Sequence, residues 1–210
     1  MNEWIHIFLS PNRSLFHIFL EFSAATLSIF SVIFAQNNNI WLYPIGIGST
    51  MIYSYLTFIT SLYGDCIINL YYTGMSLYGW YSRKNKKNHP IAFSRKKDYF
   101  YTALLFVSTC IFSTMVYYYF NEKLQSNSDY WTDGLDVFTT GIFFSGMYQM
   151  AMKKVESWIF WIIGNIISVP IYFLKGLVLT GFLFIFLVLL AIEGYVIWKK
   201  QVFLHKKNHK

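Results

Sequence analysis

The feature that most constrains this chain is a series of long apolar stretches that follow one another from residue 15 to residue 198. A helix of about 20 apolar residues crosses the hydrocarbon core of a bilayer, which is about 30 Å thick. Only 13% of the 210 residues are charged, whereas a soluble domain carries about 25%. The sequence therefore predicts an all-α integral membrane protein.

Seven transmembrane helices account for these stretches. The predicted spans are 15–36, 39–60, 62–82, 98–120, 132–151, 156–174 and 177–198. They divide the chain into an interfacial N-terminal segment (1–14), a first three-helix repeat (15–82), a basic cytoplasmic loop (83–97), a linker transmembrane helix (98–120), a second three-helix repeat (132–198) and a basic cytoplasmic tail (199–210).

The basic residues predict the orientation of the spans. If the spans alternate, fourteen of the 17 Lys and Arg residues lie on one side, in the 83–97 loop, the turn after the fifth span and the tail. Cytoplasmic loops carry an excess of Lys and Arg, so we expect these segments and the C-terminus in the cytoplasm. No soluble domain carries a basic face, so we expect no nucleic-acid partner.

Sparse matches at a spacing of 117 residues suggest an internal repeat. The matched pairs are Trp41 with Trp158, Gly48 with Asn165, Tyr55 with Tyr172 and Gly64 with Gly181. One linker span separates two units of three, so both units have the same orientation. This pattern predicts a 3+1+3 parallel repeat of three-helix bundles, and transporters place the substrate site at the interface of such repeats.

Two helix faces that carry amide and aromatic residues predict where a ligand binds. In the sixth span, residues spaced 3, 4, 3 and 4 form one face, made of Trp158, Trp161, Asn165, Ser168 and Tyr172. The third span has a similar face, made of Asp65, Asn69, Tyr72, Ser76 and Trp80. Aromatic side chains stack on flat rings and amides hydrogen-bond at fixed positions, so the faces suit a planar heterocycle with a hydroxylated part.

A purely structural interpretation of these residues is the alternative. Asn and Ser in membrane helices often only hydrogen-bond a neighbouring helix, at about 1 kcal/mol. Trp and Tyr often mark the membrane interface, which we expect for the residues near span ends, Trp41, Trp80, Trp158 and Trp198. In this interpretation Asp65, near the outer end of its span, only caps the helix. The deeper positions of Trp161 and Asn165 favour a binding site.

Ionisable residues bear on ion coupling and catalysis. No carboxylate lies at the predicted midplane, which favours uncoupled transport. Glu21, one turn after His17, and Glu193 lie nearer the span ends, and coupling through either is the alternative, because intramembrane carboxylates are functional candidates. The sequence contains no HExxH motif, phosphate-binding loop or nucleophile elbow, so we expect no enzyme, metal or cofactor.

The third, sixth and seventh spans carry a family resemblance. They read "YGDCIINLYYTGMSLYGWY" and "WIFWIIGNIISVPIYFLKGLVLTGFLFIFLVLLAIEGYVIW", and they resemble the PnuC family of bacterial nicotinamide riboside transporters. The resemblance covers most of the chain from about residue 15. It implies a fold related to the SWEET sugar transporters and a homotrimer in the cell inner membrane. It also implies facilitated diffusion of nicotinamide riboside, which is trapped inside the cell by phosphorylation.

The resemblance further implies that Trp161 and Asn165 contact the substrate, together with the amide of Asn69, where some members have glutamine. We expect Tyr72 to close the site beside Asn69, and Tyr172 to lie toward its outer mouth. Related transporters carry thiamine, riboflavin or deoxynucleosides, which are alternative substrates. A SWEET-type sugar transporter would have fewer deep aromatic residues, and a membrane scaffold or interfacial enzyme would lack the deep polar face or have a catalytic cluster.

The predicted orientation is tested by labelling single cysteines in intact cells. A cysteine at position 87 should react only after the membrane is permeabilised, because it lies in the basic loop, whereas a cysteine at position 125 should react from outside. Labelling of position 87 by an impermeant reagent in sealed cells would reverse the assignment.

Overall fold

The structure, a computed structural model, describes residues 15–59, 63–85, 90–124, 130–174 and 178–208. These residues form seven α-helices: α2 (Leu15–Gln36), α3 (Leu42–Ile59), α4 (Tyr63–Asn85), α5 (Lys96–Leu124), α6 (Tyr130–Ala151), α7 (Ser157–Leu174) and α8 (Val178–Asn208). Each helix corresponds to one predicted span, so the all-helical fold with seven helices is confirmed. The predicted interfacial segment, 1–14, lies outside the described residues.

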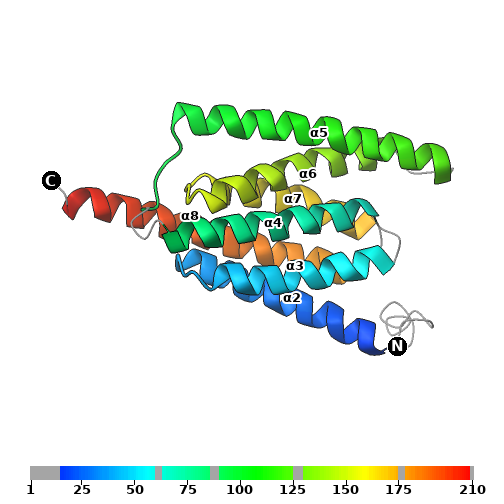
Figure 1. The fold of residues 1–210 in the computed structure, drawn as a ribbon, viewed down its shortest axis with the longest axis horizontal. Helices are drawn as coiled ribbons and strands as arrows, with labels where there is room; N and C mark the ends of the chain where they lie inside the picture. Colours follow the sequence, from blue (N-terminus) through cyan, green and yellow to red (C-terminus); the bar gives the residue numbers. More distant parts are fainter. Residues whose placement is uncertain (1–14, 60–62, 86–89, 125–129, 175–177, 209–210) are drawn as a thin grey trace.

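Six of the helices form a closed ring. Packing runs from α2 to α3, from α3 to α4, from α4 to α6, from α6 to α7 and from α7 to α8, and α8 returns to α2. Helix α5 packs against α6 and lies at the edge of the bundle (Figure 1). The helices before α5 make one half of the ring and the helices after it make the other half.

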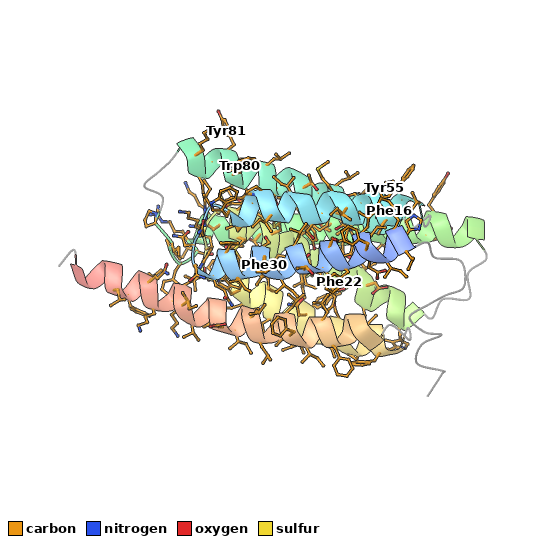
Figure 2. The ribbon with its side chains drawn as sticks, turned by 90° about the horizontal axis from the view of Figure 1, so that it is seen from below. Phe16, Phe22, Phe30, Tyr55, Trp80 and Tyr81 are labelled. Atoms are coloured by element: carbon orange, nitrogen blue, oxygen red, sulfur yellow. The ribbon has the colours of Figure 1, made fainter. Side chains whose placement is uncertain are left out.

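The bundle carries large apolar side chains on its outside and many polar side chains inside. The labelled aromatic residues of α2, α3 and α4 are exposed and project from the ribbon (Figure 2). Of the described residues, in contrast, thirteen that are buried are Ser, Thr, Asn or Gln. In a soluble protein, large apolar side chains are mostly buried and polar ones mostly exposed. The apolar surface of this bundle therefore suits contact with lipid hydrocarbon, whereas its interior is partly polar.

By length and composition, three of the described helices contain a stretch that is apolar enough to cross a membrane, at 15–36, 96–116 and 181–204. Helix α7 contributes a shorter apolar stretch, 157–171.

Two turns, one in each half of the ring, have the same backbone structure. Asn38 and Lys153 both have positive φ angles, of 51° and 54°. The Asn38 amide donates to the Ala35 carbonyl at 2.9 Å, and the Lys153 amide donates to the Met150 carbonyl at 3.0 Å. The residues of each pair are 115 positions apart, as are the first residues of α2 and α6, of α3 and α7, and of α4 and α8. The spacing of 117 aligned from the sequence is therefore wrong by two residues.

The error arises from composition, because 21% of the residues are aromatic and chance matches between aromatic residues are frequent. At the corrected spacing the counterpart of Trp158 is Tyr43. Tyr43 is buried against Gly79, and Trp158 is buried against Gly194, which is the counterpart of Gly79. A glycine without a Cβ lets a large ring lie directly on the neighbouring helix in both halves.

The four tryptophans near span ends fall into two groups. Trp41 and Trp80 are exposed, as expected of interfacial residues. Trp158 and Trp198 are almost fully buried, and their rings meet edge to face at 5.5 Å. The Trp198 indole also donates to the Ala35 carbonyl at 3.0 Å, so the prediction of interfacial anchoring is wrong for this pair.

The predicted basic segments are more structured than solvated loops. Helix α8 continues to Asn208, through most of the predicted tail, because Val202 packs into the core of the bundle. In the 83–97 segment, Ile91 is buried, and Ala92 exchanges backbone hydrogen bonds of 3.2 Å with Lys153 and Val155. This connection therefore holds the α6–α7 turn against the start of α5.

Substitution of Gly194 by Val should destabilise the protein, because an added Cβ would lie 2.6 Å from the Trp158 ring. Overpacking of this kind costs about 1–3 kcal/mol, which should lower the midpoint of thermal unfolding in detergent by several degrees. Gly74→Val is the matched control, because an added Cβ at Gly74 meets nothing within 4 Å. Equal melting temperatures for both variants would contradict the packing role of Gly194.

Candidate functional site

The predicted face of α7 points into the ring. Trp158, Asn165 and Ser168 are buried, whereas Ile159, Ile163 and Ile166, on the opposite face of the helix, are exposed. The 3, 4, 3 spacing thus separates an inward face from a lipid-facing one, as the periodicity predicted.

Trp161 lies in the interior of the ring. Its indole contacts Tyr72 of α4, with ring centroids 6.2 Å apart at an angle of 52°, and Phe143 of α6, with centroids 5.5 Å apart. Helix α4 is not a neighbour of α7 in the ring, so rings from these two helices meet only across its interior. Gly146 of α6 faces α7 at this level, since a Cβ there would lie 3.0 Å from the Phe160 Cβ atom and in ordinary contact, at 3.6 Å, with the Trp161 indole.

Asn165 follows Trp161 by one turn and is 4% exposed. Its amide lies on the same inward face of α7 as Trp161. The Trp161 Nε1 atom is buried without a partner among the described residues. An unpaired buried polar group costs about 1–3 kcal/mol. An indole N–H is therefore left available on the inward face that also carries the amide.

The predicted face of α4 lies on the other side of this region. Ser76 is buried, and Asn69 and Tyr72 are half-buried. The Asn69 carbonyl accepts from the Thr73 hydroxyl at 3.0 Å, and that hydroxyl lies 2.7 Å from the Thr50 hydroxyl of α3. The structure thus brings Tyr72 to Trp161 and places Asn69 one turn before Tyr72. Asp65 and Tyr172 belong to α4 and α7, but their side chains lie outside the described part of the structure.

Two phenylalanines of α6 were not among the predicted site residues. Phe143 packs on Trp161, and Phe144 stacks on Tyr71 with centroids 3.8 Å apart and an angle of 4°. The Tyr71 hydroxyl also donates to the Phe144 carbonyl at 3.2 Å. The sequence signal was present, since this aromatic pair lies between Gly141 and Gly146 and follows Asp136 and Thr139 at helical spacing.

The two halves of the ring differ at the positions equivalent to Trp161 and Gly146. At the spacing of 115 residues, Gly46 is the counterpart of Trp161 and Ser31 is the counterpart of Gly146. An added Cβ at Gly46 would lie 3.0 Å from the Ser31 Oγ atom. The first half therefore has two small residues, Gly46 and Ser31, in contact where the second half has the Trp161 indole. The indole therefore enters the interior from the second half of the ring.

One end of the ring is basic and tightly connected. The Arg83 guanidinium lies 5.1 Å from the centroid of the Tyr43 ring and donates to the Asn38 Oδ1 atom at 2.7 Å. In the α6–α7 turn, burial and, to a smaller extent, the Arg83 charge lower the pKa of Lys153 to about 8. These cations lie at the end that the charge pattern predicts to be cytoplasmic.

Gln36 joins the two halves at the same end. Its Nε2 atom donates to the Leu190 carbonyl at 2.7 Å and to the Glu193 carboxylate at 3.3 Å. Glu193 therefore has a partner across the contact between α2 and α8. The described residues contain no group of three His, Cys, Asp or Glu side chains that could hold a metal ion.

The chain is similar to proteins of one transporter family. The family model described as "Nicotinamide mononucleotide transporter" matches residues 18–200. The protein named "Nicotinamide riboside transporter PnuC" from Escherichia coli is 24% identical over 182 residues, which cover 74% of each chain. Its namesake from Neisseria mucosa is 23% identical over 96% of this chain and 81% of the relative.

A solved structure has the same fold. The "Crystal structure of the Vitamin B3 transporter PnuC" superposes with a TM-score of 0.64, covers 96% of this chain and 87% of that chain, and has 22% sequence identity. The comparison agrees with the arrangement of the seven helices described above.

Proposed function

The chain belongs to the nicotinamide mononucleotide transporter family, and from that premise we propose that it takes up nicotinamide riboside across the cell inner membrane. The similar proteins from Escherichia coli and Neisseria mucosa are named for that substrate. The observation that carries the proposal is the buried Trp161 indole N–H, which has no partner among the described residues and lies one turn before the buried Asn165.

The chemistry of the substrate fits the groups that these residues offer. The pyridinium ring of nicotinamide riboside is flat and positively charged, and an indole face attracts such a cation by about 2 kcal/mol or more when water is excluded. In the proposed complex, Trp161 stacks on this ring and Tyr72 closes the site from α4. The Asn165 amide, which both donates and accepts, pairs with the carboxamide of the substrate.

The remaining contacts extend along the same two helix faces. Asn69 is proposed to bind the ribose hydroxyls, and Asp65 and Tyr172 to complete the site, with Tyr172 toward its outer mouth. A thiamine molecule also carries a flat cationic ring, so thiamine is the rival ligand in the test below.

The transport path in this proposal runs between two repeats. We propose that the 15–82 and 132–198 units form a 3+1+3 parallel repeat of the SWEET type, joined by the linker at 98–120, with the C-terminus in the cytoplasm. The turns with equal hydrogen bonds 115 positions apart support the repeat. The two contacts between the units, α2 with α8 and α4 with α6, are equivalent to each other, because α2 corresponds to α6 and α8 corresponds to α4; a twofold axis would exchange them. A homotrimer of such units completes the proposal.

Transport is proposed to follow the substrate gradient, with phosphorylation inside the cell trapping the product. The predicted midplane carries no carboxylate, and Glu193, near one end of α8, has a partner in Gln36. A cation–π site binds a positive substrate without an ionised partner, so no co-transported ion is needed to balance a charge.

Substitution of Trp161 by Ala should weaken binding of nicotinamide riboside by about tenfold to a hundredfold, because stacking on an aromatic side chain is worth about 1–3 kcal/mol. Asn165→Leu should also weaken binding, since the substrate carboxamide loses its partner, but should leave the fold intact or more stable. Isothermal titration with nicotinamide riboside, and with thiamine in parallel, measures both effects.

Trp131→Ala and Ile166→Leu are the controls, because both side chains are exposed, and both variants should bind as the unsubstituted protein does. Wild-type affinity in a well-folded Asn165→Leu protein would place the site elsewhere. Tight binding of thiamine without binding of nicotinamide riboside would show that the proposed substrate is wrong, while the proposed site would stand.

Uptake into liposomes should equalise the substrate concentration across the membrane and go no further. The expected result is the same with and without a proton or sodium gradient. Accumulation against the substrate gradient that an ionophore abolishes would show coupling, and Glu21→Gln and Glu193→Gln would then identify the coupling residue.

A further inference from the structure

A groove of about 500 Å³ runs along the outside of the ring where α5 parts from α7. Its walls include Tyr99, Ala103 and Phe106 of α5, Ile142 of α6, and Phe160 and Ile163 of α7. At one end α5 approaches α6 closely, since a Cβ added to Gly141 would lie 2.7 Å from the Cys110 Sγ atom. Toward its other end the groove reaches the first turns of α5, where Tyr99 and Thr102 line it.

The groove presents hydrocarbon to whatever fills it. The Thr102 hydroxyl, which also lines it, accepts from the Gln149 Nε2 atom at 2.8 Å and donates to the Asp98 carbonyl at 2.7 Å. From Tyr99 to Val107 the wall formed by α5 is about 12 Å long, at 1.5 Å per residue. One leaflet of a bilayer has a hydrocarbon thickness of about 15 Å, so the groove matches the depth of a single acyl chain.

Basic side chains continue the same helix face beyond the groove. Lys96 precedes Tyr99 by three residues and Arg95 precedes it by four, so Lys96 lies above the groove with Arg95 beside it, and both are exposed. Lys97 lies on the opposite face of the helix.

The nearby carboxylates are already bound. Glu156 accepts from the Ser94 backbone amide at 2.9 Å and from the Tyr99 hydroxyl at 3.1 Å, and Asp98 pairs with Lys154 at 2.6 Å. Asp98 also lies beside Arg95, whose backbone amide donates to its Oδ2 atom at 2.8 Å. Lys96 is therefore the basic residue at the mouth of the groove that has no contact with these two carboxylates.

From this arrangement we propose that the groove is a binding site for an anionic phospholipid, with one acyl chain between α5 and α7 and the phosphate at Lys96 and Arg95. The apolar walls account for the chain and the two basic residues for the charge of the headgroup. The bound lipid fills the gap between α5 and the ring and so holds α5 against it. The site is separate from the ring interior, so the proposal does not depend on the identity of the transported substrate.

The test uses the full chain in detergent, titrated with short-chain phosphatidylglycerol or phosphatidylcholine while the melting temperature is followed. Phosphatidylglycerol should raise the melting temperature at lower concentrations than phosphatidylcholine. Lys96→Gln should weaken the effect of phosphatidylglycerol by about fivefold, since one basic residue near an anionic surface contributes about that factor. Lys97→Gln, one residue further along the same helix, should leave it unchanged.

Ala103→Trp, which fills the groove, should abolish the stabilisation by phosphatidylglycerol, and light scattering should show an unchanged oligomeric state. Equal effects of the two lipids, or equal effects of Lys96→Gln and Lys97→Gln, would overturn the proposal. Dissociation of an oligomer by Ala103→Trp would overturn it too, because the groove would then be an interface with a second copy of the chain.

Discussion

Hydrocarbon cannot hydrogen-bond, and the rest of this structure depends on that constraint. Each helix of the ring turns its hydroxyl and amide groups toward another helix. The Ser28 and Ser49 hydroxyls lie 2.6 Å apart between α2 and α3, and those of Thr50 and Thr73 lie 2.7 Å apart between α3 and α4. Such pairing is missing at the Trp161 indole N–H, as it is at the Trp158 indole N–H and the Tyr43 hydroxyl of the described core. Trp161 differs from those two in lying beside Tyr72 of α4, across the interior, and one turn before Asn165.

The site also depends on differences between the two halves of the ring. Similar turns and similar ring-on-glycine contacts, such as Tyr43 on Gly79, occur in both halves. The side chains differ: Trp161 stands where the first half has Gly46, and Asn165 where it has Thr50. A site between two identical halves would bind a ligand equally in two orientations. In the proposed site, the indole and the amide in one half would give a small asymmetric molecule one preferred orientation.

The sequence predicted the seven helices and the inward faces of α4 and α7, because helical periodicity and the exclusion of polar groups from lipid are local properties. It failed where contacts between distant helices decide the outcome. Trp158 and Trp198 read as interfacial residues, since nothing in the sequence shows that Gly194 lies beneath the Trp158 ring. The basic tail read as solvated, since the burial of Val202 depends on packing between segments far apart in the chain. Phe143 and Phe144 were missed because their importance comes from facing Trp161 and Tyr71.

The contact between α2 and α8 has a consequence for the biogenesis of the protein. The first and the last helix of the ring meet there. Gln36 donates a hydrogen bond to the Leu190 carbonyl, which is synthesised 154 residues later. The ring cannot close while the ribosome is still adding α8. Until then the polar faces of the earlier helices need shelter from lipid, either at the translocon or by transient pairing with one another. Closure of the ring therefore has to follow the synthesis of α8.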